Sequence, residues 1–229
     1  MNRKTRFFTI LTLSLFALFA MFTLLLCVVD RAPVWPLQEE VGFAHLNVAV
    51  REAVGQNDVW YQISEYMLPV AAAVAFAFFA LGVYQIIRRK SLWRVDPAIL
   101  SLAVIYALVV AFYVLFEIVV INYRPVLTDG VLEASYPSTH TLLVCVLMAT
   151  APIALGKLTE RRALKLGGIV VAAIVVPLTV VARMLSGVHW FTDIIGGLLL
   201  SATLVAAYPL CYGLVACFVA RLHANKESK

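Results

Sequence analysis

Residues 97–121 read PAILSLAVIYALVVAFYVLFEIVVI, a run of 25 residues in which Glu117 is the only charged side chain. A helix needs about 20 apolar residues to cross the hydrocarbon core of a bilayer, which is about 30 Å thick. The run therefore predicts a transmembrane helix. The rest of the chain has to be interpreted around this span.

Five further apolar runs have the length of a span, and they cover residues Phe7–Val29, Met67–Ile87, Ser138–Gly156, Leu166–Met184 and Phe191–Phe218. The first is too long for the apolar region of a signal peptide, so we expect it to be retained as an anchor. The sequence thus predicts an all-α fold, a six-transmembrane-helix bundle. We expect residues 1–229 to form a single membrane domain with a partly helical first outer loop over residues 30–66.

Composition excludes several other classes of protein. Hydrophobic residues make up 63% of the chain and charged residues only 14%, against about 45–50% and about 25% in a soluble domain. This excludes a soluble globule, a disordered chain and a nucleic-acid binder. The cysteines lie inside apolar runs without metal-ligand spacing, so we interpret them as small buried apolar residues: Cys27, Cys145, Cys211 and Cys217.

The Lys and Arg residues divide unequally between the two sides of the predicted spans. One side holds only four of the 18: Arg31, Arg51, Arg124 and Arg183. The other side holds the remaining fourteen, and both termini lie on that side. Because cytoplasmic loops carry the excess of positive charge, we expect both termini in the cytoplasm.

Residues 30–66 form the longest predicted outer loop. Its apolar positions Leu37, Val41, Ala44 and Val48 follow helical spacing, with polar residues such as Asn47 on the opposite face. This pattern favours an amphipathic helix in the membrane interface. A lid over a lipid entrance is the alternative.

Three polar clusters fall at the outer ends of adjacent spans. They are Asn122-Tyr123-Arg124-Pro125, then Tyr136-Pro137-Ser138-Thr139-His140, and then Arg183, His189 and Asp193. Each residue alone has an ordinary explanation: an arginine can anchor at the interface, a serine or an aspartate can cap a helix, and a histidine beside a tryptophan can lie in an aromatic belt. Three clusters on one face are harder to explain in this way.

Together the clusters supply the groups that phosphoryl transfer requires. Arg124 and Arg183 offer donors that match phosphate oxygens, and Ser138 and Thr139 open a helix whose free N–H groups favour an anion. His189 and Asp193 are four residues apart, so on a helix they would share a face. Asp193 would then orient His189 as a nucleophile, with His140 as the proton donor to the leaving oxygen.

This pattern resembles the type 2 phosphatidic acid phosphatase superfamily of integral-membrane lipid phosphatases, whose motifs are K-x6-R-P, P-S-G-H and S-R-x5-H-x3-D. Arg124-Pro125 matches the end of the first motif, and Pro137-Ser138-Thr139-His140 matches the second with Thr139 in the glycine position. The third motif is matched in spacing by Arg183, His189 and Asp193. The resemblance covers about the second half of the chain.

The resemblance implies a role for each of these residues. His189 would form a phosphohistidine, Asp193 would orient it, and His140 would act as general acid and later help to activate water. The phosphoryl oxygens would be held by Arg124, Arg183, Ser138 and Thr139. The family needs no metal or other cofactor, and vanadate should mimic its transition state.

The resemblance also implies the substrate class and the place of action. The small bacterial members suggest undecaprenyl diphosphate, phosphatidylglycerol phosphate or phosphatidic acid as substrate. The reaction would take place at the extracytoplasmic face of the membrane bilayer, in a bacterial-type inner membrane, with recycling of a cell-wall lipid carrier among the roles. The sequence does not rank these lipids, and it carries no signal for an oligomeric state.

Three departures from the motifs concern the choice of substrate. Glu117 stands seven residues before Arg124, where the family has lysine, Thr139 replaces glycine, and Ala182 replaces serine. Glu117 either pairs with an arginine and only fixes packing, or lines the pocket and tunes which headgroup fits. We expect it to lie on the same helical face as Arg124, two turns away.

Two other functions would use the same residues. A lipid-linked phosphotransferase would pass the phosphoryl group to another lipid in place of water. A transporter or flippase would use the clusters only for binding, but transporters place such groups near the middle of the membrane on broken helices.

Overall fold

The computed structural model describes residues 2–127 and 130–227. Within these residues, six helices are long and apolar enough to span a membrane. They are α1 (Arg3–Val28), α3 (Asp58–Arg89), α4 (Pro97–Ile118), α5 (Thr139–Leu158), α6 (Arg162–Leu185) and α7 (Phe191–Glu227). The prediction of an all-α bundle with six transmembrane helices is confirmed.

Local sequence explains where several of these helices begin. The Asn57 side chain accepts hydrogen bonds from the backbone N–H groups of Val59 and Trp60, so α3 starts well before the apolar run at Met67. Pro97 occupies the first turn of α4, where its missing N–H has no helical partner to lose. The helices therefore extend beyond the apolar runs where a capping residue allows it.

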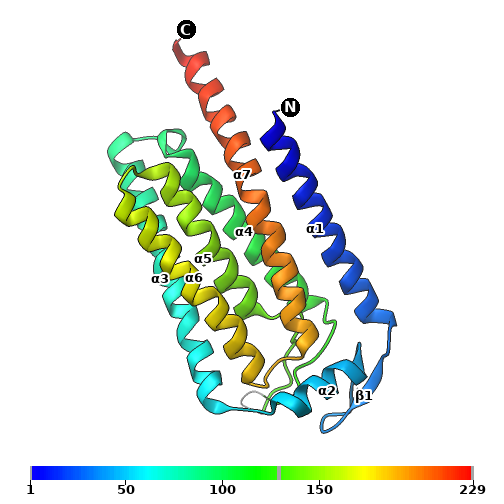
Figure 1. The fold of residues 1–229 in the computed structure, drawn as a ribbon. Coiled ribbons are helices and arrows are strands. Elements are labelled where there is room, and N and C mark those ends of the chain that lie inside the picture. The colour runs from blue at the N-terminus through cyan, green and yellow to red at the C-terminus, as the bar shows by residue number, and fades with distance from the viewer. Residues whose placement is uncertain (1, 128–129, 228–229) are drawn as a thin grey trace.

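Helix α5 lies at the centre of the bundle and packs against α3, α4, α6 and α7, while α1 packs along α7 (Figure 1). Its buried side chains, such as Leu142 and Val146, join the largest apolar core with Leu102, Ile105 and Leu204 from the neighbouring helices. The bundle thus surrounds the helix that begins with the Ser138-Thr139-His140 segment. That helix start is fixed in place by packing on several sides.

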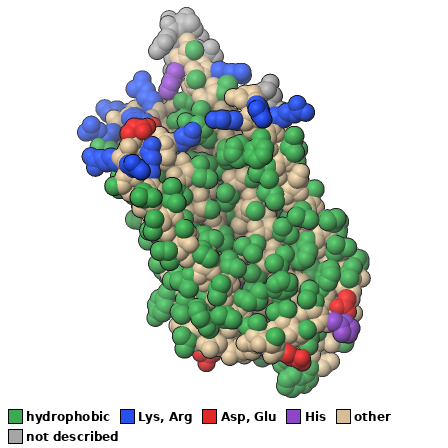
Figure 2. Space-filling view, in the orientation of Figure 1, with side chains coloured by type: hydrophobic (Ala, Val, Ile, Leu, Met, Phe, Trp, Pro, Cys, Tyr) green, Lys and Arg blue, Asp and Glu red, His purple; other side chains and the backbone are tan. Residues whose placement is uncertain are grey.

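Both termini lie at one end of the bundle, and α2 and β1 lie at the other (Figure 1). Figure 2 shows Lys and Arg side chains gathered near the end that carries the termini, with hydrophobic side chains covering the middle of the molecule. This distribution is the one expected of a multi-pass membrane protein. Which end faces the cytoplasm stays a prediction.

The loop over residues 30–66 is only partly helical, as predicted, but its helix is shorter than the apolar spacing indicated. Strands β1 (Ala32–Val34) and β2 (Glu39–Val41) pair antiparallel, and α2 (Ala44–Val54) follows them. Leu37 lies in the turn between the strands and Val41 in β2, so the prediction of a helix from Leu37 onward was wrong. Pro36 and the positive φ of Gln38 reverse the chain there, which a helix does not permit.

The orientation of α2 also differs from the prediction. Asn47, which we expected on the solvent face, is fully buried. Its amide donates to the Gly42 carbonyl and to Thr192 Oγ1, and its oxygen accepts from the Thr192 N–H. The side chain is turned inward because it pairs with polar groups at the start of α7, which an apolar residue would leave unsatisfied.

The four cysteines are free thiols. Cys145 is buried, Cys27 and Cys211 are half-buried, and Cys217 is exposed on the outer face of the bundle. The interpretation as buried apolar residues therefore holds for Cys145 and was wrong for Cys217. Exposure on a membrane span is compatible with a small apolar side chain that faces lipid.

Candidate active site

The fold brings the three predicted clusters together at the end of the bundle that carries α2. The segment before α5, the start of α5, the last turn of α6 and the start of α7 all meet there. One link is direct, because the Ser138 N–H donates to the Asp193 carbonyl at 3.0 Å. The candidate site is thus assembled from the ends of spans and the loops between them.

Arg183 and His189 form the interior of the site. Arg183 lies in the last turn of α6, and its side chain has no exposed surface. Its Nη2 lies 2.9 Å from His189 Nε2. Because a guanidinium has only donors, Nε2 of His189 must be the acceptor, and the ring proton of the neutral imidazole is on Nδ1.

Asp193 lies beside the opposite nitrogen of the same ring. Its Oδ2 is 3.6 Å from His189 Nδ1, too long for a hydrogen bond, and it accepts from the Trp190 N–H at 2.9 Å. Its Oδ1 accepts from Asn122 Nδ2 at 3.3 Å. The carboxylate is therefore held in place to face the Nδ1 proton, and it also caps the first turn of α7.

The predicted reason for this proximity was wrong, although the two residues do lie together. His189 precedes α7, which begins at Phe191, so His189 and Asp193 do not share a helical face. The positive φ of Gly187 turns the chain between α6 and α7 and presents His189 to the cap. His189 and Asp193 are therefore brought together by a capped turn and not by one face of a helix.

His140 contacts a residue that the motifs do not include. Its Nε2 lies 3.3 Å from Glu65 Oε1, and the same oxygen accepts from Arg183 Nη1 at 2.9 Å. Arg183 Nη1 also donates to Ser64 Oγ at 3.0 Å. The second turn of α3 therefore supplies two polar groups to the site.

The remaining predicted phosphate ligands lie around the start of α5. Arg124 Nη2 forms an ion pair with Glu133 Oε2 at 3.3 Å, and the Arg124 N–H donates to the Glu133 carbonyl. Ser138 occupies the N-cap position of α5, and its Oγ accepts from Thr141 Oγ1. Thr139 is the first residue of α5, where backbone N–H groups lack helical partners and favour an anion.

The surroundings of His189 determine its protonation. Burial lowers the pKa of the His189 imidazole well below its ordinary value of 6.5, and the positive charges of Arg183 and Arg124 lower it further. The ring is therefore neutral at neutral pH. A neutral imidazole with a lone pair on Nε2 is the form that can attack phosphorus.

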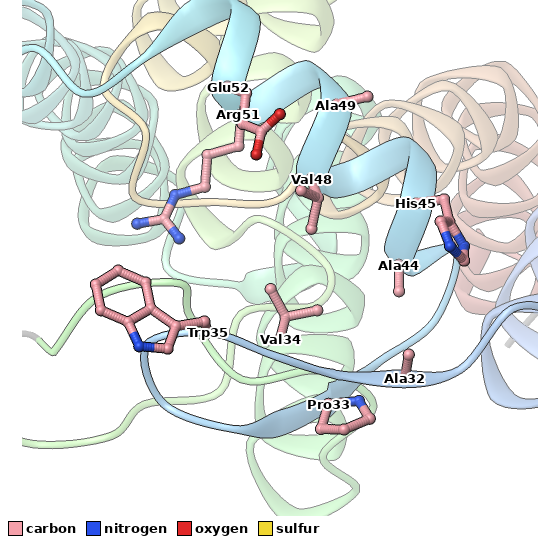
Figure 3. Close-up of a pocket in the computed structure, with 10 residues that line it drawn as sticks. All are labelled: Ala32, Pro33, Val34, Trp35, Ala44, His45, Val48, Ala49, Arg51 and Glu52. Atoms are coloured by element: carbon pink, nitrogen blue, oxygen red, sulfur yellow. The ribbon is translucent and has the colours of Figure 1, made fainter.

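An outer layer formed by the hairpin and α2 covers the loop that carries His189. The Arg51 guanidinium lies over the Trp190 ring at 5.5 Å from its centroid. Between α2 and the hairpin lies a groove of about 670 Å³, and Figure 3 shows Arg51 and Trp35 on its walls. The groove has apolar walls from Val34 and Val48, so the outer layer is hollow next to the site.

Sequence reasoning missed Glu65, Glu133 and Asn47. Glu65 and Ser64 had a weak signal, since they form a polar patch with Tyr61 at helical spacing at the outer end of an apolar helix. Glu133 had none, because loop residues follow no period. The spacing of Asn47 on an amphipathic pattern pointed to the wrong face.

Glu117 lies at the end of α4, which stops at Ile118. Arg124 belongs to the following loop, so the prediction that the two share a helical face was wrong. Glu117 is exposed, and it lines a small pocket together with Ser135, Pro137 and Thr139. It is therefore near the start of α5, on the exposed surface of the bundle.

Comparison with known proteins agrees with the resemblance. The model of the PAP2 superfamily matches residues 117–216, a range that includes all three motif clusters. The resemblance to the type 2 phosphatidic acid phosphatase superfamily is confirmed over this range. No curated protein matches the chain significantly.

Among solved structures, the crystal structure of the first transmembrane PAP2 type phosphatidylglycerolphosphate phosphatase from Bacillus subtilis matches with a TM-score of 0.62. The two chains share 16% sequence identity, and the match covers 92% of this chain and 96% of that chain. At this level of identity the likeness concerns the fold. The two proteins share their architecture over nearly their whole lengths.

Proposed function

We propose that this protein, whose residues 117–216 match the PAP2 superfamily, is a membrane lipid phosphatase that works through a phosphohistidine intermediate. The observation that carries the proposal is the contact of 2.9 Å between Arg183 Nη2 and His189 Nε2. It joins a buried phosphate-binding cation to the nitrogen that would attack phosphorus. A phosphoryl group held by Arg183 would lie within reach of that nitrogen.

In the first step, Nε2 of His189 attacks phosphorus and the bond between phosphorus and the lipid oxygen breaks. His140 gives its Nε2 proton to that oxygen, which leaves as a lipid alcohol or, from a diphosphate, as a lipid monophosphate. Asp193 stabilises the positive ring of the phosphohistidine through its Nδ1 proton. Arg124, Arg183 and the N–H groups at Ser138 and Thr139 bind the charge on the phosphoryl oxygens.

In the second step, water attacks phosphorus and breaks the bond between nitrogen and phosphorus. His140, now neutral, accepts a proton from that water, so inorganic phosphate leaves and both histidines return to their starting forms. The residues proposed for these steps balance the protons without a further group. In line with the family resemblance, we propose a reaction that is independent of metal ions.

The proposed substrates are lipid phosphates or diphosphates of the undecaprenyl diphosphate, phosphatidylglycerol phosphate or phosphatidic acid type. The structural likeness to a phosphatidylglycerolphosphate phosphatase supports this class. The site lies at the end of the bundle that carries α2 (Figure 1), and the Lys and Arg side chains gather near the opposite end (Figure 2). This distribution supports action at the extracytoplasmic face of the inner membrane.

Release of inorganic phosphate by the purified protein tests the proposal. The three lipid phosphates are each supplied in detergent micelles, with and without EDTA and vanadate, and the His189→Ala variant is the control. We expect phosphate release that persists in EDTA and is blocked by vanadate. With a lipid whose phosphate is radioactive, a phosphotransferase would instead transfer the labelled phosphoryl group to a second lipid. A flippase would release no phosphate.

A further inference from the structure

One oxygen of Glu65 contacts two groups that the proposed reaction uses. Oε1 lies 2.9 Å from Arg183 Nη1 and 3.3 Å from His140 Nε2. The Glu65 side chain is 37% exposed, whereas that of Arg183 has no exposed surface. Glu65 therefore lies at the edge of the site, between the exposed surface of the protein and the buried Arg183.

The charged and titratable groups that face His140 come from four parts of the chain. Arg183 approaches from α6, Arg124 from the loop before α5, His189 from the loop before α7, and Glu65 from α3. Among these described groups, only Glu65 is negative. Burial and the two guanidinium groups oppose a proton on His140, and the Glu65 carboxylate is the group beside the ring that favours one.

We propose that Glu65 is a positioning residue that holds the proton on His140 Nε2 until the leaving oxygen takes it, and that anchors Arg183 against His189. This inference rests on the proposed function and adds to it a residue outside the three motifs. The carboxylate acts through its neighbours and does not take part in bond making. Glu65 lies on α3, so the second span would contribute to a reaction whose other residues lie between the end of α4 and the start of α7.

The Glu65→Gln variant separates the two contacts. A glutamine oxygen can still accept from Arg183 Nη1, and Ser64 Oγ also accepts from that nitrogen at 3.0 Å. The anchoring of Arg183 is therefore retained. What is removed is the negative charge beside His140, so the variant should impair the general acid and leave the nucleophile intact.

The dependence on the leaving group gives a readout that a merely structural role would not change. Two phosphates of equal chain length are compared, one of an alcohol and one of an acidic phenol, because a phenolate leaves without being protonated. In Glu65→Gln we expect kcat for the alkyl phosphate to fall by about 10- to 100-fold and kcat for the aryl phosphate by less than about 3-fold. The basic limb of the pH–rate profile for the alkyl phosphate should move to lower pH.

Two further variants complete the experiment. Glu52→Gln removes a carboxylate from the exposed face of α2 and should leave kcat for both phosphates unchanged. Glu65→Asp keeps the negative charge with a shorter side chain, and we expect its ratio of aryl to alkyl activity to stay within about 3-fold of the original protein. Thermal unfolding of each variant reports whether it folds.

The outcomes distinguish this inference from the proposed function. If the unmodified protein releases phosphate from neither substrate, the proposed function fails. The role of Glu65 is overturned if the unmodified protein is active and Glu65→Gln lowers kcat for both phosphates equally, with an unchanged pH profile. The role would also be overturned if the ratio of aryl to alkyl activity changed as much in Glu65→Asp as in Glu65→Gln.

Discussion

Nη2 of Arg183 lies 2.9 Å from Nε2 of His189, and this contact assigns the tautomer of the histidine. The guanidinium can only donate, so the ring proton lies on Nδ1, which faces the Asp193 carboxylate at 3.6 Å. The nitrogen that is free of a proton therefore points to the cation that would bind phosphate. In the proposed reaction, this arrangement prepares the nucleophile before substrate arrives.

Replacement of His189 by alanine should abolish turnover. We expect phosphate release to fall by at least about 1,000-fold, because no other described residue at this end pairs a lone-pair nitrogen with a buried guanidinium. His45→Ala is the matched control, since His45 is an exposed histidine paired with Asp30 in the outer loop. Full activity in His189→Ala, with an unchanged thermal midpoint in both variants, would rule out the phosphohistidine.

The low pKa of His189 predicts the acid side of the pH–rate profile. The attacking ring must be neutral, and an imidazole is neutral above its pKa, so the low pKa of His189 keeps its ring neutral as the pH falls to 6.5 and below. We expect kcat/KM at about pH 6 to be at least as high as at about pH 7. On the basic side, activity should fall when His140 loses its proton.

Two substrates with different phosphate pKa values provide the control for this profile. An acid limb that moves with the substrate belongs to the phosphate, and one that stays belongs to the protein. A protein-derived acid limb at or above pH 6.5 would contradict a neutral, buried His189.

The sequence predicted the spans because a bilayer leaves few alternatives to a long apolar helix. It also predicted the meeting of Arg124, His140 and His189, since each lies at the same end of adjacent spans. The partners of these residues were not predictable. Glu65 is one acidic residue at the end of an apolar helix, and only tertiary packing decides which cation it meets.

The same limit applies to the outer layer. The pattern around Asn47 is amphipathic, and amphipathic spacing predicts a helix but not which partner its polar side chain finds. Similarly, the spacing from Glu117 to Arg124 implied one helical face only as long as the helix continued. It ended at Ile118, and the loop that follows has no period to extrapolate.

Substitution of Glu117 tests whether this residue selects the headgroup. Glu117 lines a small pocket with Thr139 at the start of α5, so a change of its charge should alter the binding of anionic headgroups. We expect Glu117→Lys and Glu117→Gln to change relative kcat/KM among phosphatidic acid, phosphatidylglycerol phosphate and undecaprenyl diphosphate while chemistry persists. An equal change in kcat/KM for all three lipids would show that Glu117 is a packing residue.

Gly196 should not tolerate alanine. A Cβ at this position of α7 would overlap the ring of Tyr136, which is buried and whose hydroxyl lies 2.7 Å from Thr23 Oγ1. Overpacking of this kind costs about 1–3 kcal/mol of folding free energy. We expect Gly196→Ala to lower the midpoint of thermal unfolding.

Gly213 is the matched control because it lies on the same helix and has nothing within 4 Å of an added Cβ. Gly213→Ala should leave the midpoint unchanged or raise it, since alanine is the better helix former. Equal effects of the two substitutions would show that the overlap with Tyr136 is relieved by movement of the ring.

The predicted topology can be tested by labelling single cysteines with a reagent that does not cross membranes. We expect Asp129→Cys, which lies outside the described residues, to react in intact cells. Glu160→Cys, at the exposed link between α5 and α6, should react only after the membrane is opened. The reverse pattern would place the proposed active site in the cytoplasm.

The several bonds of Asp193 have a consequence for genetics. Its carboxylate accepts from Trp190 and Asn122, and its carbonyl accepts from Ser138, so the residue joins the start of α7 to the start of α5 while it faces His189. A screen of random mutants for lost activity would recover position 193 for two reasons, a damaged reaction and a damaged fold. Mutant protein that still accumulates in the membrane at the normal level would report the first, and protein cleared by proteolysis would report the second.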